Sequence, residues 1–94
     1  ALKAEGEVVN RALAGMIDRD PADPEVQALI TQHHATIEPF YHATADIYRG
    51  LGSLYVEHPE FYAYYEKYAL GLPEFMRRAM KYYADHVLAP GEVA

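Results

Sequence analysis

The feature that most constrains this chain is a helical spacing of apolar residues that proline interrupts repeatedly. Val9, Leu13 and Met16 show the spacing, which is typical of amphipathic helices. Proline lacks an amide donor, so it favours the first turn of a helix or a break between helices. No segment alternates apolar and polar residues between turn signals, as a half-buried strand would. The pattern therefore predicts an all-α fold.

The breaks divide the chain into about five helices. Asp23 before Pro24 is a strong start signal, because the Asp side chain can accept first-turn amides. Pro39 ends the helix before it, and Gly71 can close another. The helices are expected at residues 2–18, 24–38, 40–56, 59–70 and 73–88. The tail, residues 89–94, is expected to fray.

Length and charge limit the class of protein. With 94 residues the chain has room for a single domain, residues 1–94, which can bury roughly 64% of its surface. Its formal net charge of −6 argues against a surface that follows nucleic-acid phosphates. No apolar run has the ~18 residues of a membrane span. A cytoplasmic protein without a membrane partner is expected, and the missing initiator Met suggests a fragment of a longer polypeptide.

Tyrosine is the unusual component, with nine copies. Each hydroxyl needs water or a hydrogen-bond partner, so the rings cannot all lie in a dry core. Rigid amphipathic rings suit a cleft that binds a bulky, mostly apolar ligand. Gly50 and Gly52 each cost about 1 kcal/mol in a helix interior relative to Ala. Either close helix packing or room for a ligand beside Tyr48 and Tyr55 would offset this cost.

The residues offer little for catalysis or metal binding. There is no cysteine, Ser53 is the single serine, and no Gly-rich phosphate loop occurs, so an enzyme is not expected. His34 with Glu38 and His42 with Asp46 have helical spacing, but carboxylate and histidine neighbours are usually surface pairs. We expect no cofactor and no metal.

A family resemblance rests on several short motifs and single residues that follow one another in a set order along the chain. They are Asp-Pro-Glu-Val-Gln at 23–27, His33, Phe40-Tyr41, Leu-Gly-Ser-Leu-Tyr-Val at 51–56, Phe61 and Gly71-Leu72. This set resembles the TipAS-type antibiotic-recognition domain found at the C-terminus of MerR-family transcription activators. The resemblance covers nearly the whole chain, and its most specific part is the Leu-Gly-x-x-Tyr-Val stretch.

The resemblance implies a globin-like bundle around a deep, largely apolar cleft that takes large antibiotics, thiopeptides in the founding members. It also implies an N-terminal DNA-binding domain and a coiled coil outside this chain, with a homodimeric full-length protein that reaches DNA only through that domain. In thiopeptide-binding members a cysteine on the helix of the Leu-Gly-x-x-Tyr-Val stretch traps the ligand. The cysteine positions fall at Ala43 and Gly50, so any ligand here is held non-covalently.

The sequence thus predicts the effector domain of a MerR-type regulator that binds an antibiotic-like small molecule. The residues expected to line its cleft are Tyr41, Tyr48, Gly50, Gly52, Tyr55, Tyr65, Phe75 and Met76. Two alternatives remain open. One is a protein-interaction or drug-sequestering helical module without DNA-linked regulation. The other is a metal sensor that uses His, Asp and Glu side chains.

Overall fold

The expected helices form, with shifted ends. The computed structural model describes residues 2–93, with side chains from residue 5. In chain order the elements are α1 (Leu2–Ala14), α2 (Pro24–Ile37), α3 (Ala45–Glu57), α4 (Pro59–Glu66), α5 (Leu72–Tyr83), a π-helix (Ala84–Leu88) and α6 (Ala89–Val93). No strand occurs between residues 2 and 93, which confirms the all-α class. None of these helices is long and apolar enough to cross a membrane.

Side-chain caps fix where the helices begin. The Asp23 carboxylate accepts the Glu25 amide at 2.8 Å, so α2 starts at Pro24 as expected. The third helix begins at Ala45 and not at Phe40, because the Thr44 hydroxyl accepts the Ile47 amide at 3.4 Å and caps the later start. Residues 38–44 are consequently a loop.

Two helices end earlier than the apolar spacing predicts. After Ala14, the Met16 amide bonds to the Leu13 carbonyl at 2.9 Å, and this tighter bond turns the chain out of α1. α4 ends at Glu66, whose carboxylate accepts the Gly71 amide at 2.7 Å. Gly71 has φ +84°, a conformation that favours glycine, and leads directly into α5.

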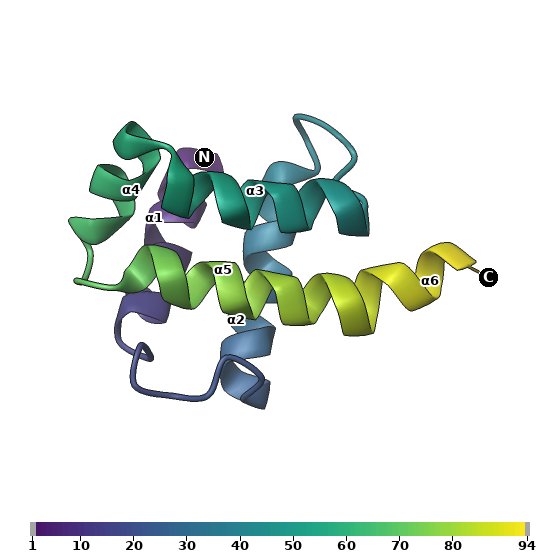
Figure 1. Ribbon diagram of the computed structural model, residues 1–94, viewed down its shortest axis with the longest axis horizontal. Coiled ribbons are helices and arrows are strands. Elements are labelled where there is room, and N and C mark those ends of the chain that lie inside the picture. Colours follow the sequence, from purple (N-terminus) through teal and green to yellow (C-terminus); the bar gives the residue numbers. More distant parts are fainter. Residues whose placement is uncertain (1, 94) are drawn as a thin grey trace.

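The expectation of a frayed tail is wrong up to Val93. α5, the π-helix and α6 run on without a gap from Leu72 to Val93 (Figure 1). The Glu92 carboxylate accepts the Ala45 amide at 2.7 Å and so ties the end of this rod to the start of α3. Pro90 has no amide donor and crowds the carbonyl four residues before it, which explains why the preceding turn widens into a π-helix. Ala94 lies outside the described residues.

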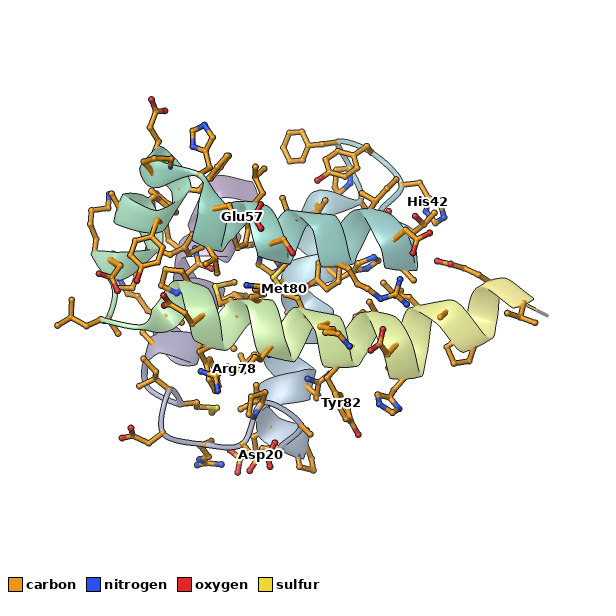
Figure 2. All side chains as sticks on the ribbon, viewed as in Figure 1. Asp20, His42, Glu57, Arg78, Met80 and Tyr82 are labelled. Atoms are coloured by element: carbon orange, nitrogen blue, oxygen red, sulfur yellow. The ribbon has the colours of Figure 1, made fainter. Side chains whose placement is uncertain are left out.

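α3 and α5 lie side by side and antiparallel, while α2 crosses behind them and α1 packs against α2 (Figure 1). α4 joins α3 to α5 at one end. In Figure 2, Met80 points between α3 and α5, whereas Arg78 points away from them. The buried core draws on α1, α2, α3 and α5, and includes Val9, Leu13, Val26, Ile30, Tyr48, Leu72, Phe75, Met76, Ala79, Met80 and Tyr83.

The two glycines of α3 differ. A Cβ on Gly52 would lie 3.2 Å from the Arg77 Cα, so Gly52 allows the backbones of α3 and α5 to approach closely. A Cβ on Gly50 would meet nothing within 4 Å. Close packing, one of the two explanations that the sequence left open, therefore accounts for Gly52.

Candidate functional site

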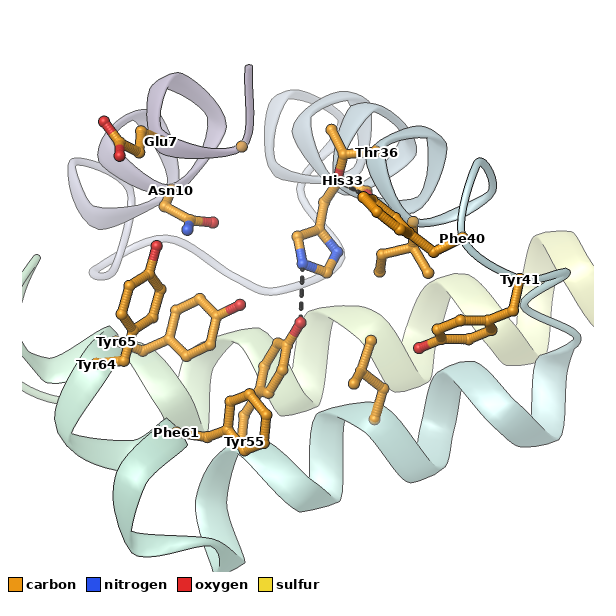
Figure 3. A pocket seen from close by; sticks show the side chains of 13 residues that line it. Glu7, Asn10, His33, Thr36, Phe40, Tyr41, Tyr55, Phe61, Tyr64 and Tyr65 are labelled. Carbon is orange, nitrogen blue, oxygen red and sulfur yellow. Dashed lines mark hydrogen bonds between the residues drawn. The ribbon is translucent and has the colours of Figure 1, made fainter. Parts of the chain in front are cut away.

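A cleft of about 360 Å³ lies among α1, α2, α3 and α4, beside the loop that joins α2 to α3 (Figure 3). Pockets for drug-sized ligands have volumes of about 300–1,000 Å³ and mostly apolar walls. Aromatic rings make up much of this wall. The lining residues are Gly6, Glu7, Asn10, His33, Thr36, Ile37, Phe40, Tyr41, Leu51, Tyr55, Phe61, Tyr64 and Tyr65.

A cluster of rings from α3 and α4 forms one side of the cleft. Tyr55 comes from the last turns of α3, and Phe61 and Tyr65 lie four residues apart on one face of α4. The Tyr55 and Tyr65 ring centroids are 4.2 Å apart, and those of Tyr55 and Phe61 are 5.9 Å apart. Tyr64 meets Tyr65 edge-on at 5.0 Å. Tyr55 and Tyr65 are buried, so this wall is held in place before any ligand arrives.

His33 of α2 joins this wall to the core. Its Nδ1 lies 2.7 Å from the Tyr48 hydroxyl, and its Nε2 lies 3.3 Å from the Tyr55 hydroxyl (Figure 3 draws the second contact). The Tyr48 hydroxyl donates to the Ile30 carbonyl at 3.4 Å. The hydrogen bonds are all satisfied when Tyr55 donates to Nε2 and Nδ1–H donates to Tyr48. The tautomer of the neutral ring is assigned on this basis.

The inner part of the cleft carries no charge near pH 7. Burial, and next the adjacent His34, lower the pKa of His33 to about 4. Burial raises the pKa of the Tyr48 and Tyr55 hydroxyls well above their usual value. Imidazole and phenols are therefore neutral, and they offer a ligand hydrogen bonding and ring faces.

α1 supplies the polar side of the cleft. Asn10 is 4% exposed, and its Oδ1 has no hydrogen-bond partner among the residues that the structure describes. Figure 3 shows its side chain directed into the cleft. Glu7 precedes it by three residues and lines the same cleft. An unsatisfied buried acceptor costs about 1–3 kcal/mol, so the Asn10 Oδ1 lowers the stability of the domain until a donor reaches it.

The loop of residues 38–44 carries two more rings, and side chains tether it. Phe40 is 72% exposed and Tyr41 is 44% exposed where they line the cleft. His34 Nε2 donates to the Ala43 carbonyl at 2.9 Å, and the Ala43 amide donates to the Glu38 carboxylate at 2.9 Å. This amide hydrogen bond is the main cause of the lowered pKa of Glu38. These hydrogen bonds tether the loop at Ala43, while the rings of Phe40 and Tyr41 remain accessible.

The structure brings three of the sequence-predicted lining residues into this cleft, namely Tyr41, Tyr55 and Tyr65. Tyr48, Phe75 and Met76 lie instead in the core, because α5 packs its apolar face against α2 and α3. Gly52 is covered by α5, and Gly50 is exposed on α3 outside the cleft lining. These five positions do not border the cleft.

Sequence reasoning missed the parts of the lining that α1 and α2 contribute. His33 is named above only as part of the family resemblance, and the structure adds that both its ring nitrogens contact tyrosine hydroxyls. Asn10 lies between buried Val9 and buried Leu13, and a polar residue on an apolar helical stripe was the available signal. No group of three or more His, Cys, Asp or Glu side chains within the described residues could hold a metal ion.

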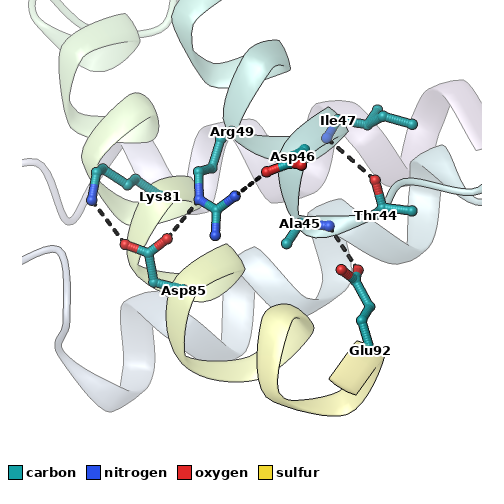
Figure 4. Close-up of polar contacts among 8 residues, drawn as sticks. All are labelled: Thr44, Ala45, Asp46, Ile47, Arg49, Lys81, Asp85 and Glu92. Atoms are coloured by element: carbon teal, nitrogen blue, oxygen red, sulfur yellow. Dashed lines mark hydrogen bonds and ion pairs between the residues drawn. The ribbon is translucent and has the colours of Figure 1, made fainter. Parts of the chain in front are cut away.

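A second polar cluster lies at the other end of α3, where α3 meets the C-terminal rod (Figure 4). We call it the polar junction; it comprises Thr44, Ala45, Asp46, Ile47, Arg49, Lys81, Asp85 and Glu92. Arg49 donates to Asp46 and to Asp85, each at 2.6 Å, and Lys81 donates to Asp85 at 2.8 Å. The hydrogen bonds from Lys81 and then Arg49 lower the pKa of Asp85. These charges are paired with one another, which is typical of a structural contact.

Comparisons with known proteins found one family and one related regulator. A family model described as the TipAS antibiotic-recognition domain matches residues 1–83. The chain is also similar to the HTH-type transcriptional activator mta of Bacillus subtilis (strain 168), with 34% identity over 86 residues. That alignment covers 90% of this chain and 34% of the activator, so the chain spans about a third of the length of this relative. No solved structure matches the chain significantly.

Proposed function

The chain belongs to the TipAS antibiotic-recognition domain family, and from this premise we propose that it is the effector domain of a MerR-family transcriptional regulator. In this proposal a small antibiotic-like molecule binds in the cleft among α1, α2, α3 and α4. A ligand that favours one arrangement of the whole regulator by a factor of ~100 in affinity would bias it by about 2.7 kcal/mol.

One observation carries the proposal: a cleft of about 360 Å³ whose wall consists largely of aromatic rings. Ring faces bury much apolar area with few torsions to restrict, so they bind at low entropic cost. The fixed pair Tyr55 and Tyr65 would support the ligand from inside, and Tyr41 would cover it from the loop. A ligand larger than the cleft would insert one part and rest the remainder on Phe40 and Tyr41.

Binding is proposed to be non-covalent. The chain contains no cysteine, so no thiol can add to an electrophilic ligand. Of the two positions that the family resemblance aligns with trapping cysteines, Ala43 is a buried residue of the loop and Gly50 is exposed, and neither borders the cleft. Affinity therefore comes from ring contacts and hydrogen bonds.

The test is a binding panel of thiopeptides and other bulky antibiotics, read by calorimetry and by amide NMR spectra of the labelled chain. We expect a ligand to shift the amides of residues 6–10, 33–41 and 55–65. Tyr41→Ala should weaken binding by about 5- to 20-fold, because it removes one accessible ring. Tyr82→Ala is the matched control, since Tyr82 is similarly exposed but lies on α5 outside the cleft. A panel that leaves every amide unmoved contradicts the proposal.

A protein-interaction module is the second candidate, and the exposed ring of Phe40 is the observation that favours it. In that case the same rings would accept an amphipathic helix or a second copy of the chain. Sedimentation at increasing protein concentration separates the two functions. A mass that rises with concentration, together with no response to any small molecule, supports the interaction module over ligand sensing.

A further inference from the structure

We propose that the cleft selects flat aromatic molecules that carry a cationic N–H donor, which Asn10 and Glu7 recognise from α1. This inference rests on the proposed ligand-binding function and specifies the class of ligand. It depends on three features of the cleft as the described side chains form it: the buried, unpartnered acceptor of Asn10, the negative charge of Glu7, and ring faces that attract cations.

The first feature is the Asn10 carboxamide. Its Oδ1 is buried, directed into the cleft and without a partner among the described residues. The nearby imidazole of His33 cannot serve it, because both ring nitrogens already contact tyrosine hydroxyls. A ligand N–H that reached Oδ1 would satisfy an acceptor that the protein alone leaves unsatisfied. A ligand without a donor would keep it buried and unpaired, which is a strong basis for discrimination.

The second feature is the charge of the lining. Among the described side chains that line the cleft, Glu7 is the one with a charge, since the pKa of about 4 keeps His33 neutral. Glu7 and Asn10 are three residues apart on α1 and therefore share a face. The Arg11 guanidinium is 4.0 Å from the Glu7 carboxylate with its side chain 69% exposed, so it remains hydrated and neutralises Glu7 weakly. From residue 5 onward the lining thus offers two acceptors and no basic side chain, which favours a ligand with positive charge.

The third feature is the aromatic wall opposite α1. The face of a tyrosine or phenylalanine ring attracts a cation, most strongly where water is excluded. The chain itself shows this preference at Tyr64, where the Lys67 ammonium lies 4.7 Å from the ring centroid. Lys67 is exposed and does not line the cleft. A planar aromatic cation would stack on the rings and direct its N–H groups to α1.

Three probes of one ring system separate shape, charge and hydrogen bonding. Acridine is neutral at pH 7.5, 10-methylacridinium is a cation without an N–H, and 9-aminoacridine is a cation with N–H donors. We expect 9-aminoacridine to bind at least about tenfold more tightly than acridine, with 10-methylacridinium between them. Calorimetry on the intact chain, at low and high salt, measures all three.

Two variants assign the selection to residues. Asn10→Leu removes the acceptor at similar volume. It should lower the affinity for 9-aminoacridine by about tenfold and change the affinity for acridine by less than about twofold. Glu7→Gln should lower the affinity for both cations by about threefold or more and reduce the salt dependence of their binding. Glu5→Gln is the matched control, because Glu5 is exposed on α1 and does not line the cleft. Thermal melts by circular dichroism check that each variant is folded.

Equal affinity for acridine and 9-aminoacridine overturns the inference, as does an unchanged ratio in Asn10→Leu. If no acridine binds but an antibiotic of the panel does, the inference fails and the proposed function stands. If neither the panel nor the acridines bind, both fail.

Discussion

The two ends of α3 meet the rest of the protein in different ways. At its start, the polar junction pairs its charges with one another, and Arg49 and Lys81 both bond to Asp85 (Figure 4). At its other end, the cleft has accessible rings and a buried acceptor, Asn10 Oδ1, that has no partner among the described residues (Figure 3). The charged side chains of the polar junction have partners, whereas the cleft holds a buried acceptor that has none among the described residues.

This difference gives the polar junction a structural role and, under the proposed function, gives the cleft a binding role. A satisfied polar cluster on the surface holds elements together and adds little stability. An unsatisfied buried group lowers stability, and in the proposed function the ligand supplies the partner that Asn10 lacks. Removing a group that has partners, such as His33 or Arg49, should therefore lower the free energy of unfolding, whereas removing the unpartnered Asn10 acceptor should raise it.

The largest expected effect comes from His33→Leu, which breaks the link between the cleft and the core. The substitution removes both imidazole contacts and leaves the buried Tyr55 hydroxyl without a partner. We expect the free energy of unfolding to fall by about 2–4 kcal/mol in urea titrations. His42→Leu, at an exposed loop position, should change it little. Equal effects of the two variants would show that the buried network does not stabilise the domain.

The next effect is a pH dependence that distinguishes the two ends. His33 has a pKa of about 4 in the folded protein against an ordinary 6.5, so the unfolded chain binds the proton first. The contribution of neutral His33 to the free energy of unfolding is complete above pH 6.5 and is lost as the pH falls toward 4. Between pH 7 and pH 5 the free energy of unfolding should fall by about 2 kcal/mol. Asp85 has a lowered pKa, so its contribution is lost below its ordinary value of 3.8.

Thermal melts between pH 8 and pH 3 would measure this dependence. In the parent chain the melting temperature should fall as the pH drops from 6.5 toward 4. In His33→Leu it should stay flat over the same pH range. A fall confined to pH values below 4 would assign the pH dependence to carboxylates and not to His33.

A smaller effect with the opposite sign is expected from Asn10→Leu in the ligand-free protein. Removing a buried, unsatisfied acceptor should raise the free energy of unfolding by about 1 kcal/mol, although the same change should weaken binding of the proposed ligand. Differential scanning calorimetry would record the gain as a higher melting temperature. A clear loss of stability would mean that Asn10 has a structural role in the free domain, contrary to the contrast drawn between the two ends.

The smallest effect should follow from Arg49→Gln in the polar junction. The arginine bridges Asp46 and Asp85 at the surface, and hydrogen bonding to Asp85 is the main cause of its raised pKa. We expect a slight decrease in melting temperature at low salt that shrinks in 1 M NaCl, because salt screens exposed pairs. Ligand affinity should be unchanged. A loss of affinity as large as that of a cleft variant would connect the two ends.

The sequence could predict the helices because local signals decide them. Asp23-Pro24 marks a helix start through its own backbone chemistry, and this prediction holds in the structure. Gly71 was expected to close a helix, but α4 already ends at Glu66 and Gly71 stands directly before α5. The start of α3 at Ala45 and the ordered tail were not predictable in this way. The tail depends on a hydrogen bond between Glu92 and the Ala45 amide, which are 47 residues apart.

The cleft was predicted as a kind of surface but only partly by residue. Tyrosine content indicated an aromatic wall, and Tyr55 and Tyr65 line it. Spacing along α3 cannot reveal which tyrosine faces the cleft and which faces the core, because α2 decides this by placing His33 between Tyr48 and Tyr55. The contribution of Asn10 likewise depends on how α1 packs across the bundle.

The contact between Gly52 and Arg77 has a consequence for motion. A Cβ added to Gly52 would lie only 3.2 Å from the Arg77 Cα, so the two backbones already pack closely and resist sliding of α3 against α5. The two helices should therefore move as one rigid body. A conformational signal from the cleft would then travel through displacements of α1 and the loop of residues 38–44, and the amides of those segments would be the ones whose hydrogen exchange slows when a ligand binds.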